Sequence, residues 1–156
     1  MADDRYRPPR APLKDEKERP TRPNLLAIII GALTDVISTT IGGLILGVAF
    51  AVFEASNGVR AEDMATQLYD TGYFRIASAV LGLSCSVLGG YVCARFANQN
   101  EYANGLAVGV IGLMVGELLS SGAAAADPWL HILAIATIPA ALLGAHLKLR
   151  RDKPVS

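Results

Sequence analysis

The sequence predicts an all-α polytopic membrane protein with four transmembrane helices, arranged as two antiparallel hairpins, and a short external amphipathic helix. The first observation is composition: 52% of the 156 residues are hydrophobic and 18% are charged, whereas about a quarter of the residues are charged in soluble proteins. The second is that the charges gather at the ends of the chain and between four long apolar runs. The third is that no run alternates like a strand of a membrane barrel, so each should be a helix, whose backbone polar groups are satisfied internally.

The chain begins with a polar segment, residues 1–24, that holds twelve charged residues and five of the eight prolines. Such a segment has too few apolar side chains to bury a core. We therefore expect a disordered cytoplasmic tail that helps to set the topology. Its net charge is +2, from seven basic and five acidic residues. The alternative is that this charge attracts the tail weakly to anionic headgroups. A second, short cytoplasmic tail is expected over residues 150–156.

The transmembrane domain is expected over residues 25–149. Its first helix, about residues 25–53, contains 29 residues with one ionisable side chain, Asp35. At about 1.5 Å per residue this helix is longer than the roughly 30 Å of bilayer hydrocarbon, so it must tilt or protrude. The second helix, about residues 74–96, has basic residues only near its ends, where long side chains reach the headgroups.

The third and fourth helices form the second expected hairpin. The third, about residues 103–121, is short and rich in glycine, and Glu117 is its only charged residue. The fourth, about residues 129–149, follows a turn-like Asp127-Pro128 step. Both are long enough to cross a bilayer, the third only barely.

The one sizeable external loop spans residues 54–73. A turn at Ser56-Asn57-Gly58 precedes apolar residues at helical spacing, which predicts a short surface helix. We expect this helix to cap the bundle; docking of a partner or gating is the alternative. Its apolar residues are Ala61, Met64, Ala65 and Leu68.

The lysines and arginines indicate the orientation. Twelve of the fourteen fall on one side of the expected domain: seven in residues 1–24, Arg95, and four near the C-terminus. Only Arg60 and Arg75 fall on the other side. The positive-inside rule therefore predicts that both termini are cytoplasmic, which requires an even number of crossings. A soluble bundle is the disfavoured alternative, because residues 41–53 offer no polar face to water.

Small residues are expected to set the helix packing. Lipid supplies no hydrophobic force between helices, and close approach requires small side chains. Glycines four residues apart occur in the first and third helices, and the second contains a glycine pair. We expect contacts within one chain, with a homodimer as the alternative. These glycines are Gly43, Gly47, Gly89, Gly90, Gly105, Gly109, Gly112 and Gly116.

Asp35 is the main candidate for a functional residue. It lies ten residues into the first helix, about 15 Å along the axis and close to the membrane interior. An aspartate in the middle of a membrane helix costs about 2.5–3.5 kcal/mol on insertion scales, so it needs a partner or a proton. Ser38 and Thr39 follow at helical spacing, and Tyr91 or Arg95 of the second helix are the expected cross-helix partners. We expect structural pairing, with a proton or ion site as the alternative.

Glu117 and His131 lie near the outer ends of the third and fourth helices, fourteen residues apart across a short turn. One interpretation is that they meet, in a pH-sensitive contact or a proton relay. The alternative, which we favour, is that both side chains simply reach water. His146 is expected at the inner membrane interface. Cys85 and Cys93 are eight residues apart on one expected helix, too far for a disulfide.

No common catalytic motif occurs in the sequence: HExxH, the P-loop, GxSxG and CxxC are all absent. We therefore expect no enzyme, no cofactor and no metal. The formal net charge is zero, from 14 basic and 14 acidic residues, which argues against a nucleic-acid binder that works through net charge.

Three short motifs resemble those of small uncharacterised four-helix bacterial membrane proteins, over about residues 25–149 of the chain. The resemblance implies a multi-pass protein of the bacterial cytoplasmic (inner) membrane. Because proteins of this kind carry no established activity, it implies no substrate and no catalytic residue. The motifs are Leu33-Thr34-Asp35, Gly89-Gly90-Tyr91-Val92-Cys93-Ala94-Arg95 and Asn104-Gly105-Leu106.

Two functions are carried forward. The function that needs the fewest special residues is that of a non-enzymatic accessory or interaction component. Its partners would be the lipid bilayer and either further copies of the chain or another membrane protein. The alternative is a small proton- or cation-coupled transporter or channel subunit that uses Asp35, with or without Glu117 and His131. An intramembrane enzyme is the least supported, because no second catalytic group stands at motif spacing from Asp35 or Glu117.

Overall fold

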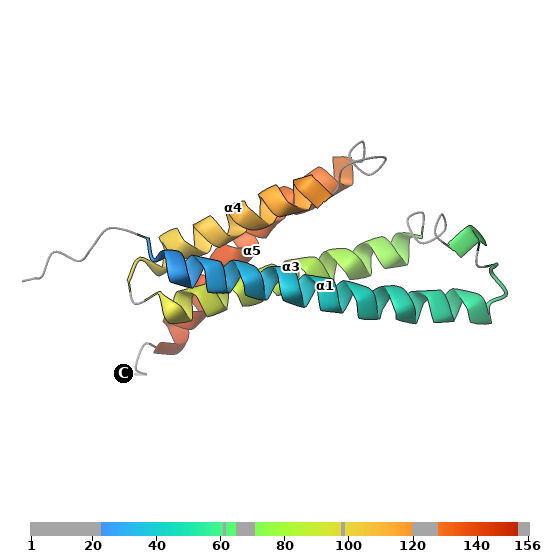
Figure 1. Ribbon diagram of the computed structural model, residues 1–156, viewed down its shortest axis with the longest axis horizontal. Coiled ribbons are helices and arrows are strands. Elements are labelled where there is room, and N and C mark those ends of the chain that lie inside the picture. The colour runs from blue at the N-terminus through green and yellow to red at the C-terminus, as the bar shows by residue number, and fades with distance from the viewer. Residues whose placement is uncertain (1–22, 61, 65–70, 98, 120–127, 153–156) are drawn as a thin grey trace, which may run out of the picture.

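The computed structural model describes residues 23–60, 62–64, 71–97, 99–119 and 128–152 (Figure 1). Within these ranges all regular structure is helical, which confirms the all-α prediction. Residues 62–64 form a short helical piece between the first two long helices. The long helices are α1 (Leu25–Ser56), α3 (Gly72–Phe96), α4 (Glu101–Leu119) and α5 (Pro128–Asp152).

Three of these helices, α1, α3 and α5, are long and apolar enough to cross a membrane. The 19-residue α4 is not among them. It carries Glu101 and Glu117 near its two ends, which leaves residues 102–116 between them, fewer than the roughly 20 apolar residues of a typical span. Within the described residues, the structure thus supports three candidate spans and does not confirm the fourth that the sequence predicts.

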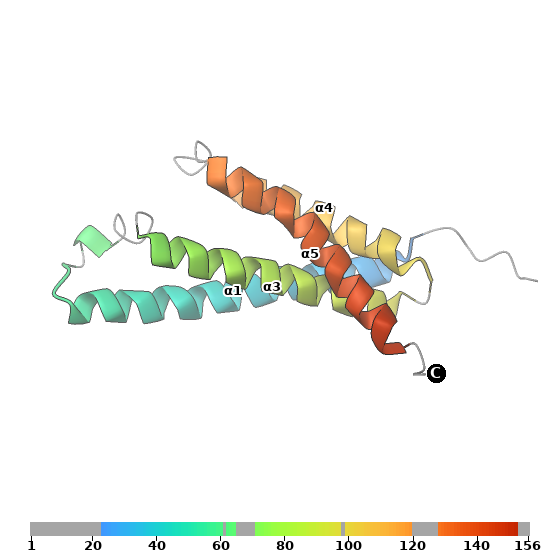
Figure 2. The ribbon, with the colours of Figure 1, turned by 180° about the vertical axis from the view of Figure 1, so that it is seen from behind.

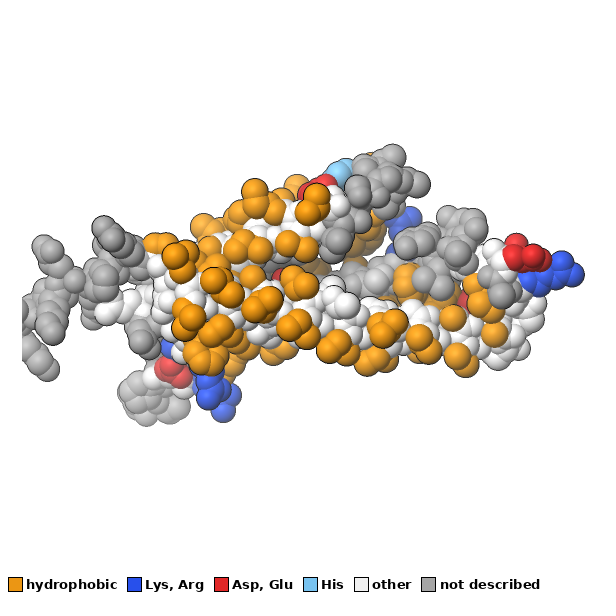
Figure 3. Space-filling model, in the orientation of Figure 1, with side chains coloured by type: hydrophobic (Ala, Val, Ile, Leu, Met, Phe, Trp, Pro, Cys, Tyr) orange, Lys and Arg blue, Asp and Glu red, His pale blue; other side chains and the backbone are white. Residues whose placement is uncertain are grey.

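The surface also indicates a membrane protein. Hydrophobic side chains cover much of the face in Figure 3, and the most apolar 18-residue stretch of α1 contributes no buried residue. Soluble monomers rarely expose apolar patches of such extent. In hydrocarbon the same surface carries no penalty.

The helices lie in two antiparallel pairs, α1 with α3 and α4 with α5 (Figure 1). At one end, here called the closed end, α1 and α4 begin, α3 and α5 end, and the two pairs lie against each other. Toward the other end, the open end, the pairs separate (Figure 2).

The helix ends lie within three residues of the expected ranges. Three expected elements fall largely or partly outside the described residues. The first is the tail over residues 1–24, of which the structure describes Pro23 and Asn24. The second is the short external helix, of which it describes residues 62–64. The third is the C-terminal tail, which lies outside the described residues beyond Asp152.

Helix α3 takes part in the two most extensive helix contacts, with α5 and with α1, and it also contacts α4. Glycines let the backbones of α3 and α5 touch at the closed end. A β-carbon built on Gly90 of α3 would overlap the Ala141 carbonyl, and one on Gly144 of α5 would overlap the Val87 carbonyl. Neither position has room for a side chain.

Glycines bring the other neighbouring helices together in the same way. Gly31 of α1 faces Gly89 of α3, where a β-carbon would lie 2.9 Å from the Gly31 carbonyl oxygen. Gly105 and Gly109 bring α4 close to α5: a β-carbon on Gly109 would lie 2.8 Å from the Cα of Ile138. The closed end is therefore a close-packed assembly of small residues.

The other glycines expected to pack are placed differently. A β-carbon on Gly43, Gly47 or Gly116 would meet no described atom within 4 Å. All three lie beyond the level of Asp35, on the half of the helices where the pairs separate. Their spacing does not serve helix packing within the described chain.

A buried polar contact joins the start of α1 to the first turn of α4. The Asn24 side chain caps α1 by accepting the Ala27 N–H at 3.3 Å, and the Asn24 N–H donates to Asn104 Oδ1 at 2.9 Å. Asn104 is 0% exposed, and its amide nitrogen donates to the carbonyls of Gln99 and Asn100. These bonds fix the relative height of α1 and α4.

Replacing Gly144 by alanine should lower the free energy of unfolding by about 1–3 kcal/mol, because the new methyl group overlaps the Val87 carbonyl and must push α3 and α5 apart. Gly47→Ala is the matched control, since its methyl group would enter open space; its effect should stay within about 0.5 kcal/mol. Reversible unfolding in mixed micelles, followed by circular dichroism, measures both. Equal losses for the two variants would contradict the backbone contact.

Candidate functional site

Asp35 lies where α1, α3 and α4 meet, and only 6% of it is exposed. The Ser86 hydroxyl of α3 lies 3.3 Å from both carboxylate oxygens and donates to them. The Thr39 hydroxyl, one turn further along α1, donates to Oδ1 at 3.5 Å. On α4, a β-carbon built on Gly112 would lie 3.1 Å from Oδ2. The carboxylate is thus enclosed by two hydroxyls and a glycine backbone.

Gly89 of α3 makes room for the Asp35 side chain. A β-carbon on Gly89 of α3 would lie 2.8 Å from the β-carbon of Asp35, so a larger residue there would force the two helices apart. Gly89 is three residues after Ser86, and residues at this spacing lie on one face of a helix. The glycine that admits Asp35 therefore also presents Ser86 to it.

Tyr91 and Arg95, the partners expected for Asp35, lie elsewhere. The Tyr91 hydroxyl accepts a hydrogen bond from Arg151 Nη1 at 3.2 Å, and Arg95 is exposed. The reason is geometric: Gly89 faces Asp35, and two further residues turn the helix by about 200°, which directs Tyr91 away. Among the described residues, the hydrogen-bond partners of Asp35 are hydroxyls, and none is basic.

Ser86 is the site residue that sequence reasoning missed. It lies inside an apolar run, where a serine is often a packing residue, and nothing local distinguishes it from Ser84. Its role follows from the register between α1 and α3. Ser38, expected on the same face as Asp35, makes no recorded hydrogen bond to it, and only Thr39 of the two expected hydroxyls does.

The structure brings Glu117 and His131 together. His131 Nδ1 lies 2.9 Å from Glu117 Oε1, and the two side chains are 47% and 41% exposed, respectively. The contact joins α4 to α5 toward the open end. It is an ion pair when the histidine is protonated and a hydrogen bond otherwise. An ion pair this exposed contributes little to stability where water surrounds it.

Polar side chains also join α4 to α5 at the closed end. His146 Nδ1 lies 2.8 Å from the Tyr102 hydroxyl. Lys148 lies 3.0 Å from a carboxylate oxygen of Asp152 and 3.8 Å from one of Glu101. Polar groups at this level are typical of the interface between a bilayer and water.

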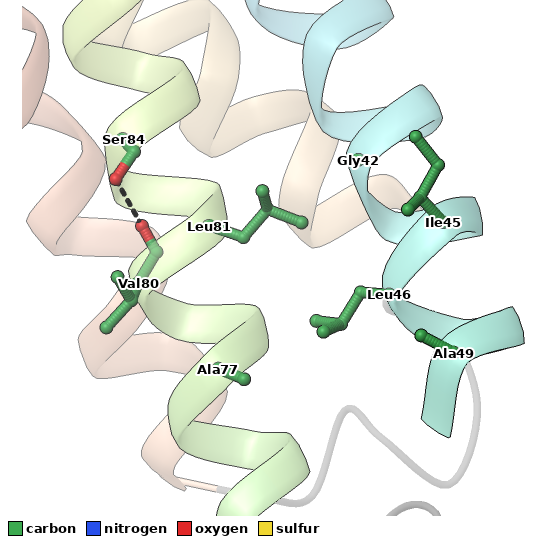
Figure 4. Close-up of a pocket in the computed structure, with 8 residues that line it drawn as sticks. All are labelled: Gly42, Ile45, Leu46, Ala49, Ala77, Val80, Leu81 and Ser84. Carbon is green, nitrogen blue, oxygen red and sulfur yellow. Dashed lines mark hydrogen bonds between the residues drawn. The ribbon is translucent and has the colours of Figure 1, made fainter. Parts of the chain in front are cut away.

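An apolar groove of about 700 Å³ lies between α1 and α3, on the half of these helices nearer the open end (Figure 4). Four residues of α1, from Gly42 to Ala49, and four of α3, from Ala77 to Ser84, line it. Ser84 is its one polar side chain, and its hydroxyl donates to the Val80 carbonyl at 2.7 Å. The groove therefore presents hydrocarbon to any occupant.

The chemistry that these residues offer is limited. Within the described ranges, no three histidine, cysteine, aspartate or glutamate residues come together as a metal site would require. Cys85 and Cys93 are buried free thiols on α3. The distinctive group is a buried acid held by hydroxyls, which can accept a proton or a cation.

Comparison of the chain with models of protein families, with curated proteins and with solved structures finds no match.

Replacing Ser86 by alanine should destabilise the protein by about 1 kcal/mol, because the Asp35 carboxylate loses its cross-helix donor. Ser84→Ala is the matched control on the same helix, since that hydroxyl bonds only to a carbonyl of its own helix. The two free energies of unfolding, measured in the same micelles, should differ by most of this amount. If Ser84→Ala proves as costly, the Ser86 hydroxyl does not hold Asp35.

Proposed function

We propose that the chain is a multi-pass protein of the bacterial cytoplasmic membrane, with four transmembrane helices in two antiparallel hairpins and both termini in the cytoplasm. The distribution of basic residues supports this orientation. Seven lie in residues 1–24, and four more lie at the closed end, against two toward the open end. The four are Arg95, Lys148, Arg150 and Arg151, and the two are Arg60 and Arg75.

In this arrangement α4 crosses the membrane despite its length. It begins at the closed end beside the start of α1 and runs toward the open end beside α5 (Figure 1). Its contacts with α5 through Gly105 and Gly109 keep it within the helix bundle. A helix with such neighbours need not carry a full apolar span of its own, because protein surrounds part of it.

A cysteine-labelling experiment tests the number of crossings. A cysteine at Asn57 should react with a membrane-impermeant maleimide in intact spheroplasts, whereas a cysteine at Asp152 should react only after lysis. The buried Cys85 and Cys93 should stay unlabelled. Reaction of the Asp152 cysteine in intact spheroplasts would mean three crossings and a C-terminus outside.

The function that the geometry supports best is that of a non-enzymatic interaction component. The observation that carries it is the groove between α1 and α3, whose described lining comes from these two helices alone. Its lining includes Ala49 and Ala77, and small residues of this kind are those through which membrane helices approach one another. The occupant is a helix of a second copy or of another membrane protein.

Site-specific photo-crosslinking tests this function. A photoreactive amino acid at Ala49, in the groove, should give a discrete protein adduct in native membranes, and an adduct of twice the chain mass would identify a homo-oligomer. The same amino acid at Leu26, exposed on the other half of α1, should react with lipid alone. Lipid adducts alone at both positions would contradict the proposed function.

A proton- or cation-coupled transporter or channel subunit is the second candidate. It is favoured by Asp35, a buried acid whose recorded partners are neutral hydroxyls. Purified protein in proteoliposomes would then carry a flux that Asp35→Asn abolishes and Asp35→Glu retains, with both variants folded. No flux under proton, sodium and potassium gradients would exclude this candidate under those conditions.

A further inference from the structure

Two arginines, Arg95 of α3 and Arg151 of α5, lie near the ends of the two helices that meet at the closed end. Arg151 of α5 donates to the Tyr91 hydroxyl of α3 at 3.2 Å. Arg95 stands four residues after Tyr91 on α3, so both lie on the same side of that helix. The Tyr91 contact therefore holds the guanidinium of α5 over the face of α3 that carries the exposed Arg95.

The described carboxylates of this end are engaged elsewhere. Glu101 and Asp152 both bind Lys148, at 3.8 Å and 3.0 Å. Because Glu101 is the first residue of α4, this network marks the side of α5 that faces α4. Among the described residues, the recorded partner of Arg151 is the neutral Tyr91 hydroxyl, and Arg95 has no recorded acidic partner. Neither positive charge therefore has a carboxylate partner among the described residues.

Exposed leucines continue this surface toward the membrane centre. Leu88 lies one turn before Tyr91 on α3, and Leu147 and Leu143 lie one and two turns before Arg151 on α5; all three are 44–51% exposed. Residues three and four apart share a helix face. The surface therefore places guanidinium groups at the helix ends beside a hydrocarbon-like patch.

We propose that Arg95, Tyr91 and Arg151, with the leucines below them, bind the headgroup phosphate and upper acyl chains of an anionic phospholipid. Guanidinium groups bind phosphate oxygens through two parallel hydrogen bonds, and arginines at the membrane surface add attraction to anionic lipid. A soluble phosphate compound shares the headgroup chemistry, but the exposed leucines favour a ligand with acyl chains. This site is separate from the groove and requires no protein partner.

Native mass spectrometry of the detergent-solubilised full chain tests the site. Cardiolipin and phosphatidylglycerol should bind the wild-type chain, and phosphatidylcholine should bind much more weakly. The Arg95→Gln/Arg151→Gln variant should bind cardiolipin about 30-fold more weakly, from the loss of two surface charges. Lys148→Gln is the matched control, because it removes a charge from the same end that is already paired, and it should bind as the wild type does.

Tyr91→Phe supplies a second variant that keeps all charges. It removes the hydroxyl that positions Arg151, so it should weaken cardiolipin binding, whereas Tyr102→Phe at the same end should not. Unchanged binding by the double arginine variant, or an equal loss in Lys148→Gln, would overturn the site in favour of attraction by net charge. Competition by glycerol 3-phosphate at the lipid's own concentration would overturn the choice of a lipid. None of these results depends on the crosslinks expected from the groove.

Discussion

The backbone contact between α3 and α5 is the constraint on which the rest of the structure depends. In lipid, helices associate through close packing and hydrogen bonds, because the solvent is as apolar as the side chains. Gly90 and Gly144 allow this packing, since a β-carbon on either would overlap a carbonyl of the other helix. The contact sets α5 on α3, and through Gly109 it sets α4 on α5. It also places Arg151 at Tyr91, so the proposed lipid site depends on the same contact.

The helix pairs separate toward the open end because the glycine contacts between helices stop there. The exposed apolar side chains of α4 and α5 on that half include Met114, Leu118, Ile132 and Ile135, which are large and cannot replace glycine contacts. The pairs therefore separate, and Asp35 lies near the point where they part, beneath Gly112 of α4. A buried acid at such a branch point is satisfied by hydroxyls from two helices. It can serve either to fix the register of α1 on α3 or to take up a proton or cation.

Much of this fold could be predicted from the sequence, because each helix coincides with an apolar run bounded by polar residues. The contact of Glu117 with His131 is one of the two interpretations that the sequence allows, because only fourteen residues separate them, but it is not the favoured one. The partners of Asp35 could not be predicted, because they depend on the register between α1 and α3, which the close contact of Gly31 with Gly89 sets. The pattern of apolar and polar residues within one helix does not reveal its register against another helix. The role of Ser86 therefore cannot be predicted from the sequence. The separation of the pairs depends likewise on contacts between helices.

The most direct test is the distance between α3 and α5 in lipid nanodiscs, measured by electron paramagnetic resonance between pairs of spin labels. One pair, at Leu88 and Leu143, reports on the closed half, and another, at Ile76 and Ile132, reports on the open half; all four side chains are exposed. If glycine contacts hold α3 against α5, the closed half gives a short, narrow distance distribution, the open half gives a longer one, and Gly144→Leu lengthens the first. Equal distances in both halves, unchanged by Gly144→Leu, would contradict this role of the glycine contacts.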